Sequence, residues 1–396
     1  MQGWSRNEVG LRSALAASRM SMARTNSGAA NLRRPRESGD AVPFTQRRWI
    51  PAFAGTTRYR GGAILRFLLV LFVLALLAAS YLYLDYRKFT ETPLTIARPD
   101  ATIDIARGET YRTIVDHLHT AGVTQASPWY WRALGRELRI EGKLHAGEYA
   151  LTQGLTPRQL LQKMAAGEVL QHHFTIVDGW TFKQLRVALA SDAGLAQTLT
   201  TASDEDIAHR LGIEDGHPEG WFLPETYSWI KGDSDFDVLK NAHVAMQKTL
   251  DRLWNGRATD VALDSPYQAL ILASIVEKET GKPEERPLIA GVFARRLKFH
   301  MRLQTDPTVI YGMGDNYDGN IRKIDLEADT PYNTYTRDGL PPAPIALPGT
   351  PALEAALHPA LGDALYFVAR GDGSHEFTAT LDEHNRAVQK YQLHRK

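Results

Sequence analysis

The pattern of apolar and polar residues shows one long uninterrupted apolar run near the start of the chain. Phe67–Leu84 holds 18 residues without a charge, which is at the short end of membrane-spanning length. A cleaved signal peptide is the alternative, with its cleavage site at Ala78-Ala79-Ser80. Tyr81 and Tyr83 follow directly and are typical of the aromatic belt at a membrane interface. We therefore predict a single transmembrane helix over residues 61–86.

The basic residues before this run predict its orientation. They are Arg58, Arg60 and Arg66. Because positively charged flanks stay on the cytoplasmic side of a membrane, we expect a cytoplasmic N-terminus. The segment from residue 86 onward is then expected on the outer side.

A second apolar run lies inside a predicted helix far along the chain. Ala269–Val276 is apolar apart from Ser274, and a helix that is apolar on every side is a buried helix. The residues around it are helix-terminal types. They are Asp264 or Ser265 as N-cap, Pro266 in the first turn, Gly281 as the C′ residue and Pro283 behind it. The pattern therefore predicts a buried helix of about four turns.

Two carboxylates, Glu277 and Glu279, stand at the end of this buried helix. With 3.6 residues per turn, side chains two positions apart point in nearly opposite directions, so the two glutamates cannot form a paired-carboxylate site. Burial raises a carboxyl pKa, and the negative end of the helix dipole acts in the same direction. Glu279 has the more apolar flank and is the preferred general acid, with Glu277 as second choice. The alternative is that both are solvated helix-end residues.

The segment that follows the predicted membrane helix reads as a small α/β unit at residues 93–171. Alternation and capping residues predict a strand, two helices, a second strand and a third helix. These elements are expected at Ala101–Ala106, Tyr111–Thr120, Ser127–Glu137, His145–Thr152 and Thr156–Ala166. The order resembles a LysM-like module, a type that binds glycans containing N-acetylglucosamine. A plain spacer domain is the alternative.

The remainder, residues 172–396, reads as a larger α+β domain built around the buried helix. A strand at His173–Val177, a helix beginning near Trp180-Thr181, a helix at Leu288–Phe299 and a strand at Leu365–Val368 are expected. Thr330–Gly349 holds five prolines and two glycines, which excludes a regular element. Long structureless loops are often functional, so we interpret this one as a cleft wall. The predicted fold class is therefore α+β.

Several polar and aromatic side chains in this domain suit a sugar-binding cleft. Amide, hydroxyl and carboxylate groups offer hydrogen bonds to hydroxyls, and aromatic rings offer flat apolar faces. The candidates are Gln304, Thr305, Asp306, Tyr332, Asn333 and Tyr335, with Glu225 and Tyr227 from the run EGWFLPETY. That run suits a buried loop anchor equally well.

Composition narrows the function further. Residues 1–60 hold 11 Arg, no Lys and 3 acidic residues, whereas the rest of the chain holds 35 basic and 42 acidic residues. An acidic body argues against nucleic-acid binding. We expect residues 1–60 to be a disordered leader or the product of an over-extended start codon, with an Arg-rich targeting peptide as the alternative. The chain has no cysteine, and His375 with His384 lack HExxH spacing and a third ligand, so no metal or cofactor is expected.

A set of motifs in order carries a specific family resemblance. They are ASIVEKET (Ala273–Thr280), ERP…AGVFARRL (Glu285–Leu297), MRLQTDPTVIYGMG (Met301–Gly314), PYNTY (Pro331–Tyr335), GLPP (Gly339–Pro342) and EHN (Glu383–Asn385). Together they resemble the MltG (YceG-like) endolytic murein transglycosylases. EGWFLPETY (Glu219–Tyr227) is similar to that family's Phe-Pro-Asp/Glu-Thr-Tyr motif, with Leu223 in the Phe place. The resemblance runs from the membrane span to the C-terminus.

This resemblance implies a lyase of the bacterial inner membrane with a periplasmic catalytic domain. It implies cleavage of the β-1,4 bond between N-acetylmuramic acid and N-acetylglucosamine in nascent peptidoglycan strands. The product end is then 1,6-anhydro-muramic acid, and the implied partners are cell-wall synthases (penicillin-binding proteins). One carboxyl group suffices, because the C6 hydroxyl of the substrate can act as nucleophile. Related enzymes carry their acid in a Glu-Ser pair, and Glu279-Thr280 matches that pair better than Glu277-Lys278.

The chain departs from the family pattern at two loop positions. Ala343 and Leu347 stand where the family often has Gly and Asn. Ala343 cannot easily take a positive φ, so the family's loop conformation transfers less directly there. A non-catalytic glycan-binding scaffold for cell-wall synthases is the alternative function, and a hydrolase is the third. Product mass distinguishes the hydrolase, because hydrolysis adds water.

Overall fold

The structure is a computed structural model and describes residues 61–393. The expectation for residues 1–60 therefore lies outside the described residues. The described part begins with the long helix α1 (Gly61–Glu91), which contains the predicted apolar run. Helix α1 is the one helix among the described residues that is both long enough and apolar enough to cross a membrane. Its apolar side chains are exposed. Three two-stranded antiparallel sheets and a larger number of helices follow, so the fold is mixed α+β as predicted.

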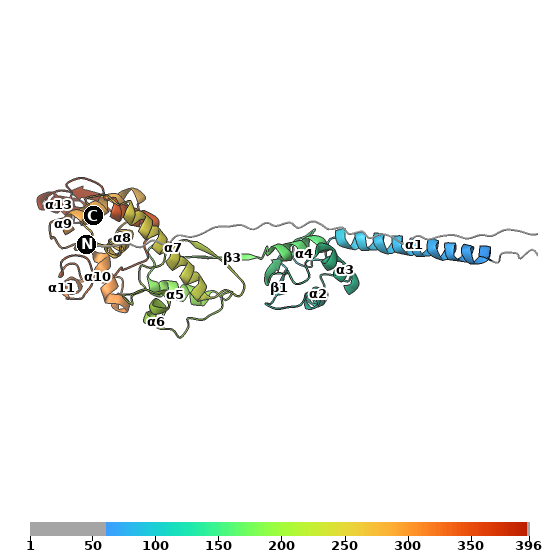
Figure 1. The fold of residues 1–396 in the computed structure, drawn as a ribbon. Helices are drawn as coiled ribbons and strands as arrows, with labels where there is room; N and C mark the ends of the chain where they lie inside the picture. The colour runs from blue at the N-terminus through green and yellow to red at the C-terminus, as the bar shows by residue number, and fades with distance from the viewer. Residues whose placement is uncertain (1–60, 394–396) are drawn as a thin grey trace, which may run out of the picture. The chain divides into compact units, whose positions relative to one another are not determined.

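The first group of elements after α1 follows the predicted order closely (Figure 1). It consists of β1 (Thr102–Ile105), α2 (Tyr111–Thr120), α3 (Pro128–Leu138), β2 (Gly147–Ala150) and α4 (Pro157–Ala166). β1 and β2 pair antiparallel, with Ile103 opposite Tyr149. Their alternating side chains pack with Trp131 and the apolar faces of the helices in one core. Capping residues set the helix starts, as Thr156 does with a capping box on α4.

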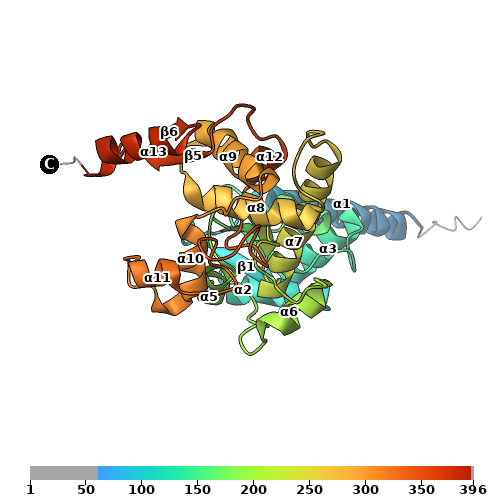
Figure 2. The same ribbon diagram turned by 90° about the vertical axis from the view of Figure 1, so that its left-hand side faces the viewer.

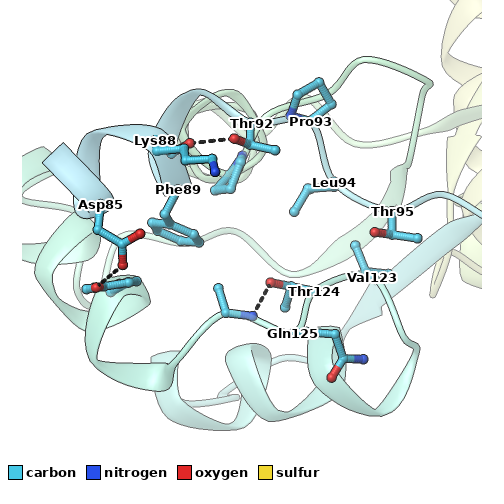
Figure 3. A pocket seen from close by; sticks show the side chains of 13 residues that line it. Asp85, Lys88, Phe89, Thr92, Pro93, Leu94, Thr95, Val123, Thr124 and Gln125 are labelled. Carbon is cyan, nitrogen blue, oxygen red and sulfur yellow. Dashed lines mark hydrogen bonds between the residues drawn. The ribbon is translucent and has the colours of Figure 1, made fainter.

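The end of α1 packs against this group of elements. Phe89 contacts Trp131, with ring centroids 5.3 Å apart, and Asp85 accepts a 2.5 Å hydrogen bond from Tyr130. Tyr86 donates a hydrogen bond to Glu137. A pocket of about 310 Å³ opens beside Phe89, between the end of α1 and the turn around residues 123–126 (Figure 3). The last turns of α1 are thus part of this folded unit.

A second hydrophobic core forms around two further strands. Its elements are β3 (Gln171–Thr175), α5 (Phe182–Ser191), α6 (Asp204–Leu211), β4 (Thr226–Ile230) and α7 (Asp235–Asn255). β3 pairs antiparallel with β4, placing Phe174 opposite Tyr227. Phe182 and Phe222 stack in the core between these elements, with centroids 5.1 Å apart. The predicted helix start at Thr181 is confirmed, because its side chain caps α5.

The third core surrounds the predicted buried helix, which is α8 (Pro266–Glu279). Figure 2 shows α8 between α7 on one side and α9 (Arg286–Lys298) and α12 (Thr350–Leu357) on the other. The other elements are η1 (Pro283–Glu285), α10 (Asp306–Met313), η2 (Gly314–Asn316), α11 (Lys323–Glu327), β5 (Tyr366–Ala369), β6 (His375–Thr378), α13 (Leu381–Val388) and η3 (Gln389–Leu393). All residues of α8 from Ala269 to Val276 are buried, and Ser265 is its N-cap. The predicted burial of this helix is confirmed.

The predicted C′ position of Gly281 is confirmed, because α8 ends at Glu279 with Thr280 as its C-cap, but Gly281 does not take the left-handed conformation typical of that position. The C-cap Thr280 is extended (φ −145°, ψ 136°). Thr280 is buried, and its hydroxyl accepts a 3.0 Å hydrogen bond from the Lys282 backbone N–H. This side-chain bond fixes the turn, so the glycine conformation typical of helix C-termini is not needed.

The proline-rich segment 330–349 has no regular element, as predicted. Its second half is buried against α8, because the Ile345 N–H donates to Ser274 Oγ at 3.0 Å. Leu347 exchanges backbone hydrogen bonds with Gly179 and Trp180. Ala343 is buried and does not take a positive φ. Ser274, the single polar residue in the apolar run, thus attaches this segment to the helix.

Candidate active site

Glu279, the last residue of α8, is the best candidate for an acid in the described structure. Its side chain is partly buried at the end of the fully buried stretch of the helix. The pKa of Glu279 is raised to about 7, mainly by burial and also by the nearby Asp306 carboxylate. The Thr305 hydroxyl and the Arg296 guanidinium lower it. A carboxyl group with this pKa is about half protonated at neutral pH and can donate a proton.

Thr305, the hydrogen-bond donor to this carboxyl, is itself held in place by two other buried threonines. The Thr305 hydroxyl donates a hydrogen bond to Glu279 Oε1. Thr305 is 2% exposed, and its backbone N–H donates to Thr334 Oγ1 at 3.1 Å. Thr308 Oγ1 lies 2.9 Å from Thr334 Oγ1 and donates to the Thr305 carbonyl at 2.7 Å. The hydroxyl that contacts the acid is therefore held by both α10 and the segment 330–349.

Two charged side chains complete the surroundings of Glu279. Asp306 is exposed at the first residue of α10, and its Oδ1 accepts a 2.6 Å hydrogen bond from the Tyr335 hydroxyl. Arg296 of α9 is buried, and its guanidinium donates to the Leu303 and Leu365 carbonyls. The structure therefore brings Glu279, Thr305, Asp306 and Tyr335 together, with Arg296 behind them.

Gln304 has an unusual backbone conformation next to this group. Its φ is +50°, and its side-chain oxygen lies 3.5 Å from Arg296. Its backbone N–H donates to the Thr334 carbonyl at 3.1 Å. Non-glycine residues with positive φ are uncommon and persist where the surroundings fix them. The exposed Gln304 amide is thus held at the edge of the Glu279 site.

Glu277 occupies a different environment from Glu279. Its side chain is 4% exposed and forms a 3.0 Å ion pair with Arg286. Its second oxygen accepts a 3.1 Å hydrogen bond from the Gly349 N–H. A charged carboxylate held by an arginine and a backbone N–H is suited to joining α8 to α9 and to the segment 330–349. Glu277 therefore has structural partners on α9 and on the segment 330–349.

The other residues predicted to bind sugar lie in three places. Asn333 is buried, and its amide donates to three backbone carbonyls of residues 325–328. Tyr332 lines a large cavity with Tyr311. Tyr227 of β4 donates to the Leu223 carbonyl, and Glu225 is exposed beside it. No hydrogen bond or ion pair joins Asn333, Tyr227 or Glu225 to Glu279 within residues 61–393.

The structure also reveals buried polar residues that were not among the sequence candidates. Glu219 is 6% exposed, and its carboxylate accepts from the Phe182 N–H at 2.9 Å and the Tyr311 hydroxyl at 3.2 Å. Burial raises the pKa of Glu219 to about 7. Helix α10, which carries Asp306 and Tyr311, was also not predicted. Thr305 followed by Asp306 and a proline is a helix-start signal that could have identified it.

The chain is similar in sequence to one protein family and to several known proteins. Residues 103–390 match the YceG-like family. An endolytic murein transglycosylase of Bacillus subtilis is 35% identical over 263 residues, covering 62% of this chain and 72% of that protein. An endolytic murein transglycosylase of Streptococcus pneumoniae is 27% identical over 356 residues, covering 80% of this chain and 63% of that protein. The crystal structure of a yceG-like protein from Listeria monocytogenes is 30% identical and covers 73% of this chain and 99% of that one, with a TM-score of 0.47.

Proposed function

The chain belongs to the YceG-like family, and from this membership and the geometry around Glu279 we propose that it is an endolytic murein transglycosylase with Glu279 as its acid. Its substrate is the glycan strand of peptidoglycan. It cleaves the β-1,4 bond between N-acetylmuramic acid and N-acetylglucosamine within nascent strands. Each cleavage terminates elongation and leaves a 1,6-anhydro-muramic acid end.

The reaction needs one proton donor that later becomes a proton acceptor. The protonated Glu279 carboxyl gives its proton to the glycosidic oxygen as the bond from that oxygen to C1 breaks. The C6 hydroxyl of the same muramic acid then bonds to C1, and its proton passes to the Glu279 carboxylate. The carboxyl group is restored and no water is consumed. A single titrating group near neutrality is therefore sufficient for both steps.

The observation that carries this proposal is the bond between Thr305 and Glu279 in a partly buried, acid-favouring environment. Thr305 orients the carboxyl, and its hydroxyl can stabilise the carboxylate that forms after proton transfer. We assign the exposed Gln304 and Asp306 and the half-buried Tyr335 around it to contacts with sugar hydroxyls. The side chains of Asn333 and Tyr227 instead donate hydrogen bonds to the backbone carbonyls of neighbouring segments.

The proposal is tested by digesting purified murein with the full chain in detergent and measuring the masses of the products by mass spectrometry. Glu279→Gln should remain folded and yield no anhydro-muropeptides, whereas Glu284→Gln, a nearby exposed glutamate, should match the parent. Products that carry an added water would identify a hydrolase, for which Asp306 beside Glu279 supplies the second carboxylate. Binding of murein without new ends would identify a scaffold. An active Glu279→Gln would disprove the assignment.

The remaining regions support a membrane-anchored architecture. Helix α1 is the anchor, with a cytoplasmic N-terminus and a periplasmic body at the bacterial inner membrane. The strand–helix–helix–strand order of β1, α2, α3 and β2 supports a LysM-like module at 93–171, followed by the catalytic domain at 172–396. Cell-wall synthases are the expected partners. Added protease should digest the periplasmic body in intact spheroplasts, and protection of the body until the cells are permeabilised would contradict this orientation.

A further inference from the structure

A large cavity lies at the opposite end of α10 from the Glu279 site. Its volume is about 930 Å³, which falls in the range of ligand sites in proteins. It is lined by α5, the turn at residues 216–219, the last part of α10 and Tyr332. Helix α10 begins with Asp306, beside Glu279, and carries Tyr311 in the cavity wall. At 1.5 Å per residue, the helix connects the two places over roughly 10 Å.

A buried carboxyl group lies in this cavity wall. Glu219 accepts hydrogen bonds from the Phe182 N–H and the Tyr311 hydroxyl. The capping box of α5 uses the N–H groups of Thr181 and Gln184, and Glu219 binds the N–H of Phe182, the first helical residue. A carboxyl group has about four acceptor positions, which leaves capacity for a further donor from the cavity.

The rest of the cavity wall is suited to a neutral ring with hydroxyl groups. Trp180, Tyr311 and Tyr332 supply aromatic surface, and Tyr311 and Tyr332 meet edge to face at 4.9 Å. Such faces pack on the apolar sides of sugar rings, and carboxylates accept their hydroxyl hydrogens.

The charges at the rim disfavour an anionic ligand. The Lys183 amine is paired with Asp315 at 2.5 Å. Asp204 is paired with Arg186 at 2.6 Å, and Glu205 adds a further negative charge. A phosphate or the carboxylates of a stem peptide would therefore meet acidic groups, whereas a neutral sugar would not.

We propose that this cavity is a second saccharide subsite, which holds an N-acetylhexosamine of the same glycan strand at a distance from the cleaved bond. This inference rests on the proposed function, because the subsite serves the reaction at Glu279. A strand that reaches both places is held more tightly than one that reaches only Glu279. The cavity thus selects long strands and favours cleavage within a strand.

The test measures KM for peptide-free glycan strands that have been separated by length. The parent should bind long strands about tenfold better than the shortest strands that are cleaved, which is about 1.4 kcal/mol. Val187→Glu places a charge in the cavity from an exposed position on α5, where the valine is 62% exposed. Trp180→Ala removes an aromatic face. In both variants the ratio of the two KM values should fall to within about threefold.

The control is Val244→Glu on α7, which changes another exposed valine away from the cavity. It should keep the length preference of the parent. Thermal melting of each variant confirms that it is folded, and Val187→Glu decides the question if Trp180→Ala does not fold. A parent without length preference, or variants that keep it, would overturn the subsite. Neither result affects the anhydro product, so the proposed function is tested separately.

Discussion

Glu277 and Glu279 lie two residues apart on α8, but the first lies beside a positive charge and the second beside a negative charge. Glu277 is paired with Arg286 at 3.0 Å and accepts the Gly349 N–H. Glu279 has Thr305 as its hydrogen-bond donor and Asp306 as a neighbouring negative charge. The helix therefore presents one carboxylate that is held by an arginine and a backbone N–H, and one carboxyl whose neutral form is favoured by burial. This difference supports the proposal that Glu279 is the acid and that Glu277 has a structural role.

The pH dependence of the reaction should follow the ionisation of Glu279. Its pKa of about 7 means that the protonated form dominates below neutrality and disappears above it. We expect kcat/KM to fall about tenfold for each pH unit above 7. Release of anhydro ends from purified strands, measured from pH 5 to 9, checks this limb. A rate that stays constant up to pH 9 would exclude a donor with this pKa.

The stability of the protein should depend on the same group. Its folded-state pKa is raised above 4.5, so the stabilising effect of the neutral form is complete below about pH 4.5 and is lost as pH rises through about 7. Glu279→Gln cannot ionise and should therefore be more stable than the parent at pH 8.5, by about 2 kcal/mol, but similar at pH 4.5. Thermal melting in detergent at both pH values measures the difference. A variant less stable than the parent at pH 8.5 contradicts this argument.

The hydroxyl of Thr305 should determine the pH at which kcat/KM begins to fall on the alkaline side. Its hydrogen bond lowers the pKa of Glu279, so Thr305→Val should move the fall in activity to higher pH. The maximal rate should also decrease by about tenfold to a hundredfold, because the carboxyl loses the group that orients it. Thr305→Ser keeps the hydroxyl and should retain most of the activity. Identical pH profiles for the valine variant and the parent would show that the bond has no role in catalysis.

The sequence pattern predicted the helices and strands that are specified by neighbouring residues. It did not predict side-chain contacts between residues that are far apart in the chain. Ser265 and the apolar run Ala269–Val276 were sufficient to locate α8, because capping and burial are local properties. Thr305, which donates the hydrogen bond to Glu279, was predicted only to bind sugar. Nothing in the sequence around Thr305 indicates that its side chain contacts a helix residue 26 positions earlier in the chain. Glu219 was overlooked for the same reason. Its burial depends on Phe182 and Tyr311, which are remote in the chain.

The ion pair of Glu277 with Arg286 should contribute to stability rather than to proton transfer. Both side chains are largely buried, at 4% and 12% exposed, so removing one partner leaves the other charge without compensation. We expect Glu277→Gln to lose about 3 kcal/mol, and the double variant with Arg286→Gln to recover part of that loss. Melting temperatures of the two single variants and the double variant give the coupling. A fully stable Glu277→Gln that produces no anhydro ends would instead identify Glu277 as the acid.

Gly220, next to the buried Glu219, should be irreplaceable for two separate reasons. Its φ is +83°, and an added Cβ would lie 2.6 Å from the Pro344 ring. Gly212 has a similar φ of +76° with no atom within 4 Å of an added Cβ. Gly212→Ala should therefore show only the conformational penalty, about 1 kcal/mol. Gly220→Ala should lose roughly 1–3 kcal/mol more, because Pro344 lies in the buried segment on α8 and cannot easily move. Thermal melting of the two variants separates the effects, and equal losses would show that Pro344 is free to adjust.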